Sequence, residues 1–105
     1  MEEIIIPKGI IGEILRAGQM IQDNRHPTDV FLQLSEEAGE LATELSIYAG
    51  YSKKEPGPDK IPGEAADVLI CAIDLVYKTY NLSETEIEEI IRKKLQKWLN
   101  KSKVQ

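Results

Sequence analysis

The sequence has few residues that form disulfides or bind soft metals. It contains one cysteine and one histidine among its 105 residues. A single cysteine cannot form an internal disulfide and is compatible with a reducing compartment. A single histidine excludes a di-iron carboxylate bundle, which needs a Glu-x-x-His motif on each of two helices. We therefore expect a cytoplasmic protein without an internal disulfide.

Long apolar runs and an excess of positive charge are missing as well. No apolar stretch reaches the roughly 18 residues of a membrane span. The three isoleucines at residues 4–6 end at a proline and lack the basic start of a signal peptide. The formal net charge of −5 repels the backbone of a long nucleic acid. We therefore expect no membrane partner and no nucleic-acid polymer as a partner.

What the sequence does contain is a helical pattern that suits one domain over residues 1–105. Apolar residues recur at three- and four-residue steps, which predicts helices at about residues 10–22, 28–48 and 61–80 and a fourth after Ser83. Thr28 or Asp29 is expected to cap the second helix, and Ser83 with Glu86 forms a capping box for the fourth. A loop rich in proline covers residues 50–63. The sequence predicts an all-α, four-helix bundle-like fold.

The faces of the second and third helices set an expectation for the core. The stripe expected to be buried on the second helix runs from Phe31 through Leu45 to Tyr48. Apolar residues cover about two thirds of the third helix and leave one polar strip, which includes Asp67, Cys71 and Asp74. A helix this apolar is expected to be surrounded, so that its acidic strip faces an internal site.

Two pairs of acidic residues interrupt this pattern. Glu37 and Glu40 are three residues apart, as are Glu64 and Asp67, so each pair shares one helix face and its like charges repel. Isolated buried carboxylates are costly, and a cation relieves that cost. Ligands that are all oxygen favour hard ions, which most often work on phosphates. The four residues therefore predict a site for Mg²⁺, with Mn²⁺ possible. The neighbouring Glu36 points almost directly away and is the poorest candidate ligand.

The pattern Glu36-Glu37-x-x-Glu40, then 23 residues, then Glu64-x-x-Asp67 resembles the signature of the MazG-like nucleotide pyrophosphohydrolases, in the all-α NTP pyrophosphatase superfamily. The resemblance covers roughly residues 31–97. It implies a MazG-type fold that oligomerises through its helices, as a homodimer or homotetramer. It also implies Mg²⁺-dependent hydrolysis of nucleoside triphosphates, standard, deoxy or non-standard, to the monophosphate and pyrophosphate.

The residues themselves, and for Lys94 and Lys97 the resemblance, suggest roles for individual side chains. Glu36 or Glu40 would take the proton of the attacking water as the catalytic base. The candidate substrate-binding residues are two lysines of the loop, two lysines of the last helix, and an acid two turns after Asp67: Lys53, Lys54, Lys94, Lys97 and Asp74. Asp74 has a second interpretation, a structural pair with Lys78 four residues on. Where the family often carries an asparagine in the last helix, this sequence has Trp98.

A second function from a different class fits the same helices. A helical module that binds a nucleotide or another protein without turnover would keep the fold and need no complete set of acids. The presence of all the motif acids favours catalysis. The preferred base and sugar, and the phosphorus attacked, stay open.

Overall fold

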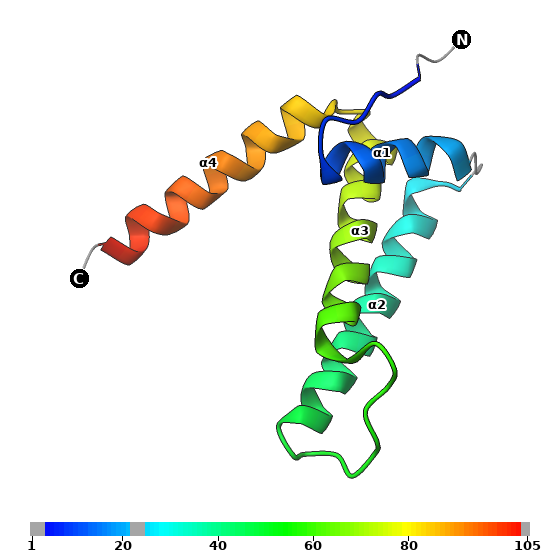
Figure 1. The fold of residues 1–105 in the computed structure, drawn as a ribbon, viewed down its shortest axis with the longest axis vertical. Helices are drawn as coiled ribbons and strands as arrows, with labels where there is room; N and C mark the ends of the chain where they lie inside the picture. Colours follow the sequence, from blue (N-terminus) through cyan, green and yellow to red (C-terminus); the bar gives the residue numbers. More distant parts are fainter. Residues whose placement is uncertain (1–3, 22–24, 104–105) are drawn as a thin grey trace.

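The computed structural model describes residues 4–21 and 25–103, and within them it contains four helices and no strand (Figure 1). The helices are α1 (Ile10–Ile21), α2 (Pro27–Tyr48), α3 (Lys60–Tyr80) and α4 (Glu84–Lys103). The expected all-α class is therefore confirmed, and the helix boundaries agree with the sequence pattern to within about two residues. Residue 22, at the end of the first predicted helix, lies outside the described residues.

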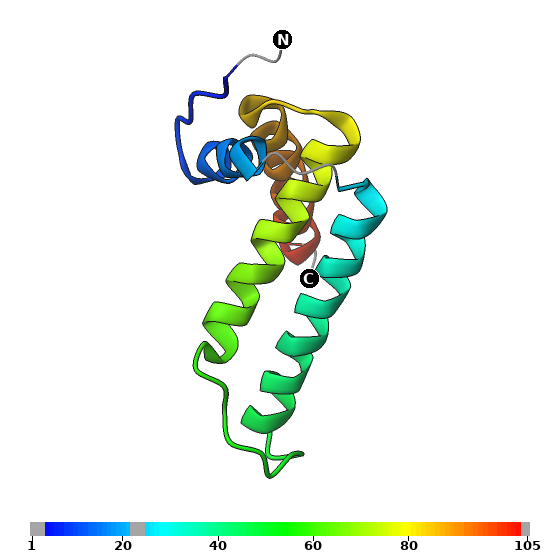
Figure 2. The same cartoon turned by 90° about the vertical axis from the view of Figure 1, so that its right-hand side faces the viewer.

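α2 and α3 run side by side in opposite directions and form the long axis of the molecule (Figures 1 and 2). His26, not Thr28 or Asp29, is the N-cap of α2: its Nδ1 accepts the Thr28 backbone N–H, and Asp29 accepts the His26 N–H. The prediction of the cap was wrong because histidine is rarely considered a capping residue. The loop of residues 49–59 joins the far ends of the two helices.

The apolar core lies at the opposite end, where α1 crosses the pair. Its buried side chains come from three helices and include Ile14, Leu15, Ile73 and Ile87. Leu15 is only 1% exposed. The core is therefore built around α1, the last turns of α3 and the first turn of α4.

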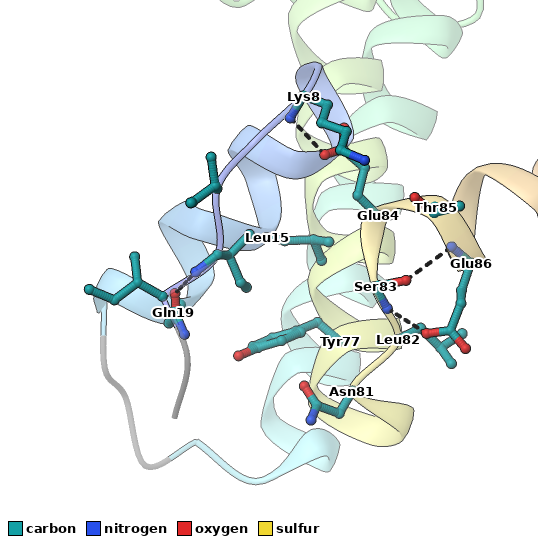
Figure 3. A pocket seen from close by; sticks show the side chains of 13 residues that line it. Lys8, Leu15, Gln19, Tyr77, Asn81, Leu82, Ser83, Glu84, Thr85 and Glu86 are labelled. Atoms are coloured by element: carbon teal, nitrogen blue, oxygen red, sulfur yellow. Dashed lines mark hydrogen bonds between the residues drawn. The ribbon is translucent and has the colours of Figure 1, made fainter. Parts of the chain in front are cut away.

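The segment of residues 4–9 folds over this core, and the side chains of Gln19 and Glu84 bind its backbone (Figure 3). Gln19 Oε1 accepts the Ile5 N–H at 2.9 Å, and Glu84 Oε1 accepts the Lys8 N–H at 2.8 Å. Gly12 permits this arrangement, because a Cβ there would overlap the Glu84 carboxylate. A cavity of about 530 Å³ lies between the segment, α1 and the turn from α3 to α4. It is far from the acid pairs on α2 and α3.

α4 begins with the expected capping box, in which Ser83 and Glu86 exchange hydrogen bonds. After its first turns it leaves the other helices and projects away from them (Figure 1). Every described side chain of residues 89–102 is exposed, including that of Trp98. None of the described helices is both long and apolar enough to cross a membrane.

The expected inward-facing polar strip of α3 is confirmed, since Cys71 and Asp74 are buried, but the expected burial of the apolar residues of α2 and α3 was wrong for the single chain. Phe31 and Leu45 are about half exposed and Tyr48 is 80% exposed, whereas Val30 and Glu44 are the buried residues of α2. On α3 the apolar Leu69 and Ile70 are exposed, and the buried residues include Cys71 and Asp74 from the polar strip. Polar residues therefore make up part of the buried surface of the two helices, beside apolar residues such as Val30 and Ile73, and part of their apolar surface faces outward.

Candidate metal centre

The acid pairs of α2 and α3 meet between the two helices and form what we call the acidic cluster: Glu37, Glu40, Asp59, Glu64 and Asp67. Oxygens of Glu37, Glu40 and Glu64 all lie within 4.8 Å of one another, and so do oxygens of Asp59, Glu64 and Asp67. Glu64 belongs to both groups and joins them. Through Glu64 the structure thus links Glu37 and Glu40 to Asp67, but neither group of converging oxygens contains all four residues that the sequence predicts as metal ligands.

The antiparallel arrangement of the helices explains this meeting. A turn of α-helix advances about 5.4 Å, so two acids three residues apart stand one above the other on each helix. Because α2 and α3 run in opposite directions, Glu37 of α2 lies nearer to Asp67, and Glu40 lies nearer to Glu64. Partial burial, followed by the charges of Glu40 and Asp67, raises the pKa of Glu37.

The pKa of Glu64 is raised as well. It is raised first by partial burial and then by Glu40, Asp67 and Asp59. Within the residues that the structure describes, no hydrogen-bond donor reaches Oε2 of Glu37 or Oε2 of Glu64, although both atoms are buried. A buried carboxylate oxygen without a donor is costly. A cation that shares these oxygens would remove both the repulsion and the missing contacts.

The donor set fits a hard divalent cation. It consists of carboxylate oxygens alone, converging from two helices and the end of a loop. Mg²⁺ and Mn²⁺ take oxygen ligands of this kind, whereas zinc and copper favour nitrogen and sulfur. Glu37, Glu40, Glu64 and Asp67 are the side chains that would hold such an ion, with Asp59 as an additional ligand.

Asp59 is a site residue that sequence reasoning missed. It is the last residue of the loop, at the N-cap position of α3, where its side chain caps no helical N–H. A Cβ at position 63 would lie 2.5 Å from the Asp59 Cβ, so Gly63 is what allows this side chain to come so close to α3. The sequence signal for this position was an acid just before a helix, Asp59, followed four residues later by a glycine, Gly63.

Glu44 of α2 contacts the loop that leads to the acidic cluster. It is only 9% exposed, and its two carboxylate oxygens accept the Gly57 N–H at 3.2 and 3.1 Å. The contact ties the middle of the loop to α2, one turn beyond Glu40. It thereby fixes the path of the chain that leads to Asp59.

Other predicted site residues belong to neither group of converging oxygens. Glu36 is exposed and belongs to neither group of converging oxygens. Lys53 and Lys54 are exposed on the loop, and Lys94 and Lys97 are exposed on the projecting part of α4. A single chain therefore does not bring the α4 lysines to the acids.

Asp74 lies two turns from Asp67 and is only 8% exposed. Its carboxylate pairs with Lys78 and with Arg25, each at 3.0 Å. Arg25 also donates to Gln33 at 2.6 Å, so the group links the start of α2 to α3. Of the two interpretations of Asp74, the structure shows the pair with Lys78 and adds Arg25 as a second partner.

Comparisons with protein-family models, with curated proteins and with solved structures give no match to this chain.

Proposed function

We propose that this chain is a nucleotide pyrophosphohydrolase of the MazG-like type, which hydrolyses nucleoside triphosphates to the monophosphate and pyrophosphate with the help of Mg²⁺. The observation that carries the proposal is the convergence of carboxylate oxygens from α2 and α3 to within 4.8 Å. It agrees with the resemblance of the two acid pairs to the signature of that family.

The chemistry requires neutralised phosphates and an activated water. A divalent cation in the acidic cluster would offset the phosphate charge and make a bound water more acidic. The chain's own part is to take the proton of the water as the bond between the α- and β-phosphates breaks and pyrophosphate leaves. Of the two candidate bases, Glu40 lies within the cluster and Glu36 lies outside it, so we assign this role to Glu40. Lys53 and Lys54 lie on the loop that enters the cluster, where they would contact phosphate oxygens.

We also propose that the protein works as a homodimer or homotetramer. The apolar residues Ile90, Leu95 and Trp98 of α4 are exposed, as are Leu69 and Ile70 of α3, and association would cover them. A second copy would also bring Lys94 and Lys97 toward an acidic cluster, which a single chain does not do. Light scattering should give two or four times the 11.8 kDa of one chain, and a monomer at micromolar concentration would contradict the proposal.

Purified protein, mixed with each nucleoside triphosphate and Mg²⁺, tests the activity through the release of pyrophosphate. Glu40→Gln and Asp67→Asn should reduce release to background while circular dichroism stays helical. Glu13→Gln removes the same charge from the exposed face of α1 and should leave the rate unchanged. An active Asp67→Asn protein would refute the assignment, and the same assay on Glu36→Gln decides between the two candidate bases.

The alternative, a helical module that binds a nucleotide or another protein without turnover, is favoured by the apolar surface of α4. The pyrophosphate assay separates the two functions, because a binding module would hold the nucleotide and release nothing. Release of orthophosphate instead of pyrophosphate would indicate a different metal-dependent hydrolase.

A further inference from the structure

An apolar cavity of about 380 Å³ adjoins the acidic cluster at the loop end of the α2–α3 pair. Glu44 and Lys60 line it, and they lie one helical turn beyond Glu40 and one turn before Glu64. The rise of an α-helix makes each of these steps about 6 Å along the axis. The cavity is therefore next to the place where the proposed function puts the phosphates.

The remaining walls of the cavity come from the last turn of α2, the loop and the first turn of α3: Ile47, Tyr48, Pro56, Ile61 and Pro62. The lining surface is almost wholly apolar. Glu44, its one acidic side chain, accepts the Gly57 N–H with both carboxylate oxygens, so its polar atoms serve the loop. The cavity thus has a fixed wall and little capacity to form hydrogen bonds with what it receives.

Tyr48 lines the cavity and is nevertheless 80% exposed. Because the Tyr48 ring is exposed to solvent beside the apolar cavity, it can stack on a flat group that binds in the cavity. Aromatic rings bind nucleobases by stacking, an interaction that tolerates any base because each has a flat π-face. Tyr51 is exposed as well, but it does not line the cavity.

We propose that this cavity receives the nucleobase of the substrate, stacked on Tyr48, so that bases are recognised by shape and discriminated only weakly. The inference rests on the proposed function, which places the phosphates of the same nucleotide at the acidic cluster. The ribose bridges the short distance between the two.

Weak discrimination follows from the chemistry of the walls. An apolar pocket separates similar ligands by roughly 10- to 200-fold, whereas a pocket built to hydrogen-bond its ligand reaches about 10⁴-fold or more. We therefore expect kcat/KM values for the four standard deoxynucleoside triphosphates to lie within about 200-fold of one another.

A second cavity, at the other end of the α2–α3 pair, would predict strong discrimination between bases if it received the base. It measures about 220 Å³ and lies beyond Cys71, where α1 meets α2 and α3. Three polar side chains line it, and Arg25 donates hydrogen bonds to the other two, Gln33 and Asp74. A base that bound there and exchanged these hydrogen bonds for its own would be discriminated more strongly than a base in an apolar cavity.

Calorimetric titrations of the full chain in Mg²⁺ test the inference with two ligands. One is a deoxynucleoside triphosphate with an uncleavable α,β-methylene bridge, and the other is inorganic tripolyphosphate, which has no base. Tyr48→Ala should weaken the nucleotide by about 5- to 150-fold, the range of one lost base stack, and leave tripolyphosphate unchanged. Tyr48→Phe should restore nucleotide affinity, and Tyr51→Ala should change neither ligand.

Several results would overturn the inference. They are an unchanged nucleotide affinity in Tyr48→Ala, an equal loss for both ligands, and a nucleotide-specific loss in Gln33→Ala, which would place the base in the other cavity. If tripolyphosphate still binds in these cases, the proposed phosphate site stands without the base site. If neither ligand binds in Mg²⁺, the proposed function fails and the inference fails with it. Nucleotide binding that depends on Tyr48 without pyrophosphate release would refute catalysis alone.

Discussion

Replacing Glu64 by glutamine is the most direct test of the acidic cluster, because this carboxylate is shared by both groups of converging oxygens. In the absence of divalent cations the substitution should raise the melting temperature. Partial burial and the neighbouring Glu40 and Asp67 raise the pKa of Glu64, which means that its ionised form is disfavoured in the folded state. A neutral amide of the same size removes that penalty.

With cations present, the effect should reverse. A ligand that binds only the folded state at 100 times its Kd stabilises it by about 2.7 kcal/mol. For a domain of about 100 residues each kcal/mol raises the melting temperature by about 4 °C, so the native chain should gain roughly 10 °C in saturating Mg²⁺. A tenfold loss of affinity removes about 1.4 kcal/mol of this linkage. Glu64→Gln should therefore lose at least half of the shift.

Thermal melts followed by circular dichroism, in EDTA and in rising Mg²⁺ at constant ionic strength, measure both effects. Glu13→Gln is the matched control, since it removes the same charge from an exposed position on α1. Its melting temperature should rise with Mg²⁺ as much as that of the native chain. The reasoning is refuted if Glu64→Gln keeps the full shift or if the native chain shows none.

Other consequences concern stability and the loop. Backbone N–H groups of Lys8, Gly12 and Gly9 lower the pKa of Glu84, so its contribution to stability is present above the unfolded pKa and is lost as the pH falls through the folded one. Chemical unfolding of Glu84→Gln should accordingly show a deficit near neutral pH that shrinks in acid. Leu15→Ala empties the centre of the core and should cost about 2–5 kcal/mol in urea unfolding. Gly63→Ala should displace Asp59 and reduce the Mg²⁺-induced rise in melting temperature, while the metal-free melt retains a cooperative transition.

Local signals in the sequence were enough for the helices and for the acid pairs. The three-residue spacing of Glu37 with Glu40 and of Glu64 with Asp67 fixes which carboxylates share a face, whatever the tertiary structure. The capping box of Ser83 is equally local, because its hydrogen bonds join residues three apart. Such features depend on helical geometry alone, and this is why the sequence predicts them correctly.

Apart from the cap of α2 by His26, what the sequence did not reveal depends on contacts between distant segments. The position of Asp59 requires the loop to be tied to α2 by Glu44 and Gly57, thirteen residues apart. The direction of α4 depends on Glu84, which meets Lys8 seventy-six residues away. An apolar pattern shows which face of a helix is apolar. It does not show whether the residues that pack against this face belong to the same chain. The sequence pattern predicts a buried Tyr48 for that reason, whereas the side chain is exposed.

The exposed apolar residues of α2 and α3 and the convergence of the acidic cluster have one cause, the orientation of the two helices about their axes. Turning α2 and α3 so that Leu69 and Leu45 met would bury apolar area, but it would separate the carboxylates that now converge. The observed orientation leaves that apolar area exposed and also places like charges close together. Under the proposed function, a divalent cation would reduce the repulsion between the carboxylates, and a second copy of the chain would cover the exposed apolar residues. We therefore expect cation binding and self-association to strengthen each other, because both favour the same orientation of this helix pair.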